Sequence, residues 1–450
     1  MICFSLWSAR TGSNAFRKLR VLIEEYFLPC NLLKFKLLNA IGIFSITNDL
    51  NSMKVLQVNV SYGYGSTGTI VRDLYLQCAQ NQIECKVACL YYTEQNSDIY
   101  CMSAPLSNKL HALFSRIEGK QGYYSKRATL KLLRFIKVYN PDIVHLHNLH
   151  SNYINLPILL SYLSEIDVKV VVTHHDCWLY TGGCSHYTHS HCFKWKESCG
   201  NCPQRYEEFA AIIRDSSSQI LRDKVRLFSA VKKLTSVGVS NWITNEARVG
   251  AFAHAYSITI HSGIDTSFFR PVDSSLRNAL NIDDKFIILA PTNKWFLPSN
   301  RNILDYFLTH LTDDMILLFF GPGDFQAPSF TNQVLNIGFI SSREQLRELY
   351  CAGDVMVNCS KEDTLSLLNL EVQSCGTPVV TYSNTGIKET INEQCGFVVE
   401  NDNPEAAWNA MMSIKEKGRS FYIDACHQWV DAEFEKNKNY QKYINLYKSL

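Results

Sequence analysis

The sequence lacks several features that would assign it to other classes of protein. No apolar run reaches the ~18 residues that a helix needs to cross a bilayer, so no transmembrane helix is predicted. No charge dominates, because 44 Lys and Arg stand against 42 Asp and Glu, for a net charge of +2. This balance argues against nucleic acid as a partner, since dedicated nucleic-acid-binding proteins usually carry a basic excess. With 46% hydrophobic and 19% charged residues among 450, and no low-complexity segment, bulk disorder is excluded.

Residues 1–52 lack the charged start, apolar stretch and cleavage site of a secretory signal. Met53 then precedes a buried-strand pattern, which is how many α/β domains begin. We interpret residues 1–52 as a leader or non-core extension. The alternative is a membrane-surface segment, because Arg17, Lys18 and Arg20 lie near Leu and Phe residues. We expect a cytoplasmic protein, with peripheral contact at the inner face of the plasma membrane under the second interpretation.

From Met53 onward, short apolar runs alternate with helical patterns, which predicts parallel, doubly wound sheets. A first block gives strands at 55–60, 86–90, 142–146, 169–173 and 236–239, with helices at 69–82 and 128–138. A second block gives strands at 286–290, 315–320, 334–337, 355–358, 378–381 and 396–399, with helices at 300–310, 343–351, 365–374 and 404–415. The tail, 421–450, is predicted as one helix. Two similar blocks indicate two similar domains facing a cleft.

The first motif, Gly63-Tyr-Gly65-Ser-Thr-Gly68, follows the first strand and opens a helix. Glycines there let the backbone approach a phosphate, and the helix N-terminus supplies amide hydrogens. A dinucleotide-binding domain would add an acid near the end of the second strand, but Cys89-Leu-Tyr-Tyr92 has none. The alternative is a tight strand–helix turn that needs glycine.

The second motif runs from Asp363 through Glu371 to Gly376-Thr-Pro378. If Leu365 opens the helix, Asp363 lies at its start and Glu371 about two turns in. Both acids would then face the carboxyl edge of the sheet, where open α/β folds bind ligands.

Several stretches agree in order with one family. They are the glycine loop, Pro141–His147, Val172–Trp178, Val239–Trp242, His261–Asp265 and the acidic motif. From Met53 onward the chain resembles a family 4 retaining glycosyltransferase of the GT-B fold, in the subgroup that makes surface polysaccharides (colanic acid, O-antigen, capsule). The resemblance implies an α/β fold of two Rossmann-like, doubly wound parallel-sheet domains facing a cleft, with a C-terminal helix crossing back. We place an N-terminal acceptor domain at 53–260, a donor-nucleotide domain at 261–425 and a final helix at 426–450.

The resemblance also implies roles for site residues. Glu371 would hydrogen-bond the ribose of the nucleotide, and a carboxylate that accepts two vicinal hydroxyls is a good clamp. Asp363 would lie near the transferring sugar, at a position where relatives usually have glutamate. Alternatively, the neighbouring Glu362 aligns with that glutamate. His175 matches the cleft histidine; the alternative is a histidine satisfied by backbone. His145 and His147 share one strand face and are either site residues or packing.

The donor diphosphate needs positive charge, and the family manages without a bound metal, so no catalytic cofactor is expected. Relatives carry Arg-Lys-Gly after the first strand of the second domain. Here Arg301 can align with the arginine, Asn302 replaces the lysine, and Lys294 could substitute from the other side of the loop. The predicted donor-binding residues are Gly63, Gly65, Gly68, Lys294, Arg301, Leu365 and Glu371.

A cysteine cluster lies in a long insert, residues 174–204. Its spacing is Cys184-x7-Cys192-x6-Cys199-x2-Cys202, followed by Pro203. Four thiols in this pattern fit a tetrahedral, structural zinc site that would fold the loop. The alternative is free or disulfide-paired thiols.

Together these features predict a hexosyltransferase that uses a nucleotide diphosphate sugar and a glycan acceptor, most simply a polyprenyl-linked one. Two alternatives stay open from the sequence. One is a non-catalytic paralogue that binds sugar nucleotides or glycans, suggested by Asn302 and Asp363. The other is a nicotinamide-dependent enzyme that uses the glycine loop.

Overall fold

The structure is a computed structural model that describes residues 52–94, 96–102, 105–208, 211–323 and 332–450. Met53–Leu450 forms one compact unit. The predicted leader, apart from Ser52, lies outside the described residues and stays a prediction. Among the described residues, the helices are too short or too polar for any of them to span a membrane.

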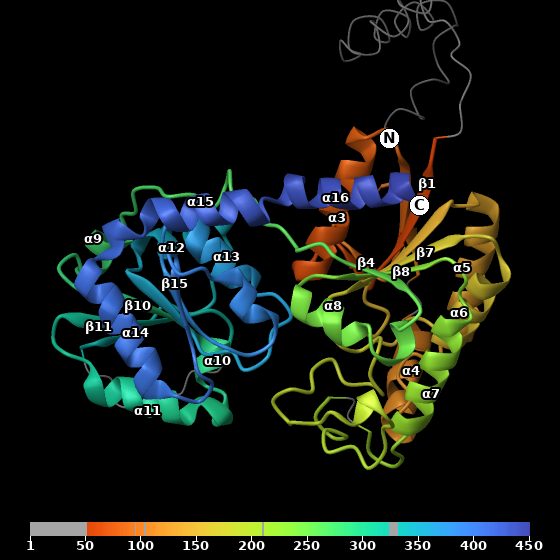
Figure 1. The fold of residues 1–450 in the computed structure, drawn as a ribbon, viewed down its shortest axis with the longest axis horizontal. Helices are drawn as coiled ribbons and strands as arrows, with labels where there is room; N and C mark the ends of the chain where they lie inside the picture. The colour runs from red at the N-terminus through yellow and green to blue at the C-terminus, as the bar shows by residue number, and fades with distance from the viewer. Residues whose placement is uncertain (1–51, 95, 103–104, 209–210, 324–331) are drawn as a thin grey trace, which may run out of the picture. The chain divides into compact units, whose positions relative to one another are not determined.

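The first half of the unit is built on a seven-stranded parallel sheet with the strand order β5-β3-β1-β6-β7-β8-β9 (Figure 1). The strands are β1 (Lys54–Val58), β3 (Glu84–Cys89), β5 (Ile99–Cys101), β6 (Ile143–Leu146), β7 (Lys169–His174), β8 (Leu234–Gly238) and β9 (Tyr256–Thr259). A two-stranded sheet pairs β2 (Ser61–Tyr62) with β4 (Tyr91–Tyr92). The helices are α3 (Gly65–Gln80), α4 (Pro105–Glu118), α5 (Lys126–Tyr139), α6 (Leu156–Glu165), α7 (Ser217–Ser229) and α8 (Asn241–Ala247).

Helices cover both faces of this sheet because its strands are apolar on both sides. On β1, Val55 packs into one cluster with α3, whereas Leu56 and Val58 pack into another cluster with α5, α6 and α7. Successive strand residues point to opposite faces, so a run of buried residues requires a layer on each side. This confirms the predicted doubly wound architecture.

The second half repeats the plan with a six-stranded parallel sheet of order β12-β11-β10-β13-β14-β15. The strands are β10 (Phe286–Pro291), β11 (Met315–Phe320), β12 (Val334–Asn336), β13 (Val355–Asn358), β14 (Val379–Tyr382) and β15 (Gly396–Val399). The helices are α9 (Leu276–Leu280), α10 (Thr292–Trp295), α11 (Arg301–His310), α12 (Arg343–Ala352), α13 (Leu367–Ser374) and α14 (Pro404–Lys417). One face packs on α11 and α14, the other on α12 and α13.

The chain ends in two helices, α15 (Ile423–Phe434) and α16 (Lys436–Ser449). The prediction of one continuous tail helix is therefore wrong, because Glu435 takes an extended conformation between them and its side chain caps α16. The predicted crossing back is confirmed: α16 lies beside α3 (Figure 1), where Gln77 Nε2 donates to Asn437 Oδ1 at 2.8 Å. The exact domain limits stay predictions.

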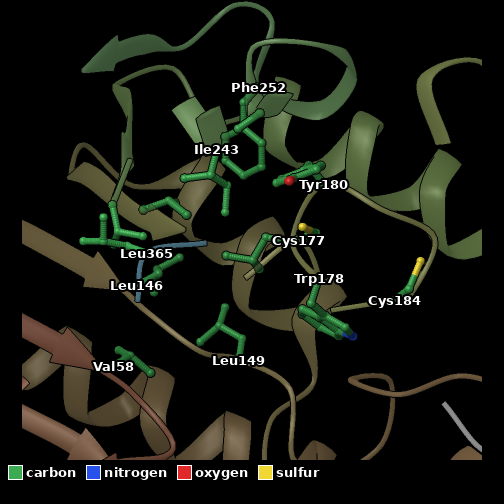
Figure 2. Close-up of a cluster of buried hydrophobic side chains, with 14 of the residues drawn as sticks. Val58, Leu146, Leu149, Cys177, Trp178, Tyr180, Cys184, Ile243, Phe252 and Leu365 are labelled. Carbon is green, nitrogen blue, oxygen red and sulfur yellow. The ribbon is translucent and has the colours of Figure 1, made fainter. Parts of the chain in front are cut away.

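The apolar core is continuous between the two halves. Leu365, on the loop before α13, belongs to the same buried cluster as Leu146, the last residue of β6, and Leu149, which follows that strand (Figure 2). The cluster also includes Trp178 and Tyr180 from the insert, so the insert is anchored in the core of the first half.

Candidate active site

A cleft of about 570 Å³ opens between the start of α3, the helices α12 and α13, and the start of α16. Residues from both halves of the unit line it, among them Gly63, Gly65, Thr69, Arg343, Glu371 and Lys436. The predicted glycine loop and one of the two predicted acids therefore share one cleft.

The glycine loop forms the floor of this cleft at the N-terminus of α3. Gly63 and Gly65 have φ of 71° and 67°, a left-handed conformation that favours glycine. Gly63 N donates to Gly68 O at 2.8 Å, and a Cβ at Gly68 would lie 2.6 Å from Ser61 Oγ. Each glycine thus meets a backbone or packing requirement, and the loop presents the first amides of a helix to the cleft.

Glu371 lies on α13 and its carboxylate is half-buried at the cleft wall. Burial raises its pKa to about 7, while Arg343 and the Tyr350 hydroxyl act in the opposite direction. Tyr350 Oη donates to Glu371 Oε2 at 3.4 Å. The carboxylate therefore has one long intramolecular hydrogen bond and keeps accepting capacity for a ligand.

Asp363 and Glu362 are distinguished by their partners. Glu362 Oε1 accepts two hydrogen bonds from the Cys-rich insert, from Thr188 Oγ1 at 2.8 Å and His189 N at 2.6 Å. Asp363 Oδ1 accepts a long bond, 3.3 Å, from the backbone N of Leu365, and the Ser366 side chain also bonds to this carboxylate. Burial raises the pKa of Asp363, whereas Lys294 and His186 lower it. Glu362 is thus engaged by the insert, whereas Asp363 bonds to residues of its own segment and does not line the cleft.

His175 follows β7 and belongs to a chain of imidazoles. Its Nε2 lies 3.0 Å from His147 Nδ1, and His147 Nε2 lies 3.2 Å from Gln57 Oε1. Burial lowers the pKa of His175 to about 4, so the ring is neutral at pH 7. The backbone oxygen of His175 accepts from Thr364 Oγ1 at 2.7 Å, which places this histidine next to the acidic loop.

The two strand histidines of β6 have different surroundings. His145 is fully buried, with Tyr447 Oη at 2.6 Å on one ring nitrogen and Thr173 Oγ1 at 2.7 Å on the other. It therefore ties α16 to the sheet. His147 orients His175 through its hydrogen bond, and neither ring is among those that line the cleft.

The predicted cations do not lie where the sequence placed them. Arg301 is exposed and its Nε donates to both carboxylate oxygens of Asp305, at 2.8 and 2.9 Å. Lys294 is close enough to Asp363 to lower its pKa, but neither residue lines the cleft. Arg343 does line it, with its guanidinium 4.3 Å from the centroid of the Phe268 ring. Sequence reasoning missed Arg343 because an arginine in the first turn of an amphipathic helix carries no distinguishing pattern.

Two further predictions need correction. Helix α13 begins at Leu367, capped by Ser366, and not at Leu365. Leu365 is buried in the core; its neighbours Leu367 and Leu368 line the cleft instead. His186 of the insert lies close enough to Asp176 and Asp363 to lower the pKa of both, a contact that its place in the Cys-rich loop did not predict.

The four cysteines of the insert converge on one small cavity, which Cys184, Cys192, Cys199 and Cys202 all line. Each of them is a free thiol. Within the part of the chain that the structure describes, no group of three or more His, Cys, Asp or Glu side chains is arranged to hold a metal ion as it stands. The thiols share a cavity without a formed coordination shell, and zinc binding stays a prediction.

The fold and the cleft define a glycosyltransferase of the GT-B type. Residues 67–206 match the family model described as Glycosyltransferase Family 4, and residues 298–417 match the one described as Glycosyl transferases group 1. With one match in each half, the chain belongs to these glycosyltransferase families, which confirms the resemblance seen in the motifs.

Relatives agree with this assignment. The chain is 22% identical over 428 residues to the putative colanic acid biosynthesis glycosyl transferase WcaC of Escherichia coli K12, covering 88% of this chain and all of that one. Sucrose-phosphate synthase from Thermosynechococcus elongatus has a TM-score of 0.62 at 16% identity, covering 88% of this chain and 98% of that one. HepE of Anabaena, solved with UDP, has a TM-score of 0.60 at 14% identity, covering 88% of this chain and all of that one.

Proposed function

We propose that the protein is a retaining hexosyltransferase that moves a sugar from a nucleotide diphosphate donor to a lipid-linked glycan in surface-polysaccharide synthesis. The observation that carries the proposal is the position of Glu371, a half-buried carboxylate in the same cleft as the glycine loop and Arg343. The solved complex of HepE with UDP supports a nucleotide donor. The likeness to WcaC supports a polysaccharide product.

Each part of the donor has a partner of suitable chemistry in this cleft. The Glu371 carboxylate accepts hydrogen bonds from the two ribose hydroxyls. Arg343 and the amides at the start of α3 face the diphosphate, whose charge they balance. We assign no cofactor to the transfer step, and this stays a prediction.

We propose front-face attack as the mechanism. The bond between the anomeric carbon and the diphosphate oxygen breaks, and the acceptor oxygen forms its bond on the same face. The departing phosphate oxygen receives the proton of the acceptor hydroxyl. Asp363 and the neutral His175 orient the sugar and stabilise the developing positive charge on its ring. No covalent adduct forms with Asp363 or Glu371.

The surface of α4 and α5 supports a membrane-anchored acceptor and peripheral contact with the inner face of the plasma membrane. The exposed side chains Leu106, Leu110 and Phe114 recur at four-residue spacing and so share one face of α4. Basic residues dominate α4, α5 and their connection: Lys109, Arg116, Lys120, Lys126, Arg127, Lys131, Arg134 and Lys137, against the acid Glu118. An apolar face flanked by such charge suits an anionic lipid surface.

The test is a transfer assay with radiolabelled UDP- and GDP-sugars and polyprenyl-linked acceptors. We expect a radiolabelled glycolipid whose new linkage keeps the anomeric configuration of the donor, as read by NMR. Glu371→Ala should abolish most of this turnover. Glu405→Ala, an exposed acid on α14, is the matched control and should leave it unchanged. Turnover by Glu371→Ala at the rate of the unaltered chain, or an inverted linkage, would contradict the proposal.

A further inference from the structure

The Cys-rich insert, residues 174–204, contains little regular structure beyond the short 3-10 helix Lys194–Lys196. Its aromatic side chains anchor one side of it: the ring centroids of Tyr180 and Tyr187 lie 4.9 and 5.3 Å from that of Trp195. The opposite side of Trp195 borders the cavity that the four cysteines line. The insert is thus fixed by an aromatic cluster, and its four thiols line the neighbouring cavity together with Lys194 and Ser217.

The turns that carry the thiols are held in place by hydrogen bonds of their own. Lys194 Nζ donates to the backbone oxygens of Gly200 and Asn201, both at 3.1 Å, within the Cys199–Cys202 turn. Cys202 N donates to Asp215 Oδ2 at 2.8 Å. These bonds constrain the backbone of the turn that carries Cys199 and Cys202 beside the cavity.

The Cys199–Cys202 turn has a backbone that brings its two thiols to one side. Gly200 and Asn201 have φ of 136° and 46°, so the chain reverses sharply between the cysteines. At Gly182 an added Cβ would lie 2.7 Å from Cys199 Sγ. The absence of a side chain at Gly182 therefore lets this thiol lie against the loop segment that leads to Cys184.

We propose that Cys184, Cys192, Cys199 and Cys202 bind one zinc ion as thiolates. Four sulfur donors around one cavity are the preferred set for tetrahedral Zn(II). Binding requires the four side chains to turn inward from their present positions, and each thiol releases its proton to solvent as its sulfur bonds to the ion. Lys194, which lines the same cavity, offsets part of the negative charge of the tetrathiolate.

A four-thiolate site is closed, so this zinc has a structural role. Bound zinc would close the loop between Cys184 and Cys192. This loop contains Thr188 and His189, the two residues that donate to Glu362. Zinc binding thereby fixes the segment through which the first half contacts the acidic loop of the second. The proposal stands independently of the transfer reaction, because metal binding is measured directly.

The experiment measures metal bound to the full chain purified without chelator, by inductively coupled plasma mass spectrometry. We expect about one zinc per chain. Substitution with Co²⁺ should give the thiolate charge-transfer and tetrahedral d–d absorption bands. Cys192→Ser removes a half-buried ligand and should lose the metal, whereas Cys101→Ser, an exposed cysteine of β5, should keep it.

Two results would overturn the proposal. One is a folded chain that purifies without zinc and shows no cobalt bands after reconstitution. The other is a Cys192→Ser variant with the metal content and cobalt spectrum of the unaltered chain. If Cys192→Ser fails to fold, the thiols of the unaltered chain are titrated with an organic mercurial instead, and released zinc is measured. Zinc release in step with modification of the thiols supports the site, and thiol modification without release contradicts it.

Discussion

The acidic segment that follows β13 and the Cys-rich insert that follows β7 contact each other, yet different forces hold them. In the acidic segment, Asn358 Nδ2 donates to Asn369 Oδ1 at 2.7 Å, and Ser366 caps α13. A strand, a capped helix and a buried polar network thus fix Asp363 and Glu371. The insert depends on aromatic packing and, in our proposal, on zinc. The two acids are therefore positioned by regular secondary structure, whereas the insert makes a contact whose geometry must be stabilised within the insert itself.

The largest expected effect comes from Asp363, which our proposal places at the reacting sugar. Asp363→Asn should lower kcat by about 100-fold, because a preorganised charge at the transition state is lost. Steady-state transfer kinetics measure this. A kcat within a few-fold of the unaltered chain would remove Asp363 from the site.

Arg343 and Arg301 test which cation faces the donor. Arg343→Ala should weaken UDP binding by roughly tenfold or more, the loss of a charge-assisted hydrogen bond. Arg301→Ala should leave it unchanged, since Arg301 is exposed and paired with Asp305. Isothermal titration with UDP measures both. The reverse order of effects would restore the family alignment that the sequence suggested.

The pH dependence of UDP binding follows from Glu371, whose pKa burial raises to about 7. Above pH 7 the carboxylate is charged and accepts the ribose hydroxyls; below it, protonation should reduce affinity by up to about tenfold per pH unit. The free energy of unfolding depends on pH in the opposite direction from UDP affinity. Because the folded pKa lies above its ordinary value, this group's contribution to stability is fully present at low pH and is lost as pH rises through 7. Glu371→Gln should flatten both profiles, which titration and thermal unfolding across pH measure.

Glu362 should give the smallest effect, because its partners are in the insert. Glu362→Gln keeps an acceptor for Thr188 and His189 and removes only the charge, so kcat should fall by less than about tenfold. The rate at which a protease cleaves the insert should rise by a larger factor than the factor by which turnover falls. A loss as large as that of Asp363→Asn would show that Glu362, the alternative register, is the acid at the sugar.

Much of the fold could be predicted from sequence because buried parallel strands are continuous apolar runs. The predicted limits of β11, β13 and β15 match the structure. The break at Glu435 could not be predicted, because its neighbours favour helix and an extended residue there depends on contacts with a segment far away in the sequence. Ile264, for example, accepts from Lys436 N at 2.9 Å.

The site was only partly predictable for the same reason. Glu371 and the glycine loop lie within motifs, and the structure brings Gly63, Gly65 and Glu371 into one cleft, although their roles stay predictions. Arg343 and the contact between Glu362 and the insert depend on residues far apart in the chain, which no local pattern reports.

The central claim is that Glu371 holds the nucleotide of a sugar donor, and UDP titration of matched variants tests it most directly. At a pH above 7 we predict that the unaltered chain binds UDP and that Glu371→Gln binds at least about tenfold more weakly, while Glu405→Gln equals the unaltered chain. Equal UDP affinity for Glu371→Gln and the unaltered chain would contradict the account.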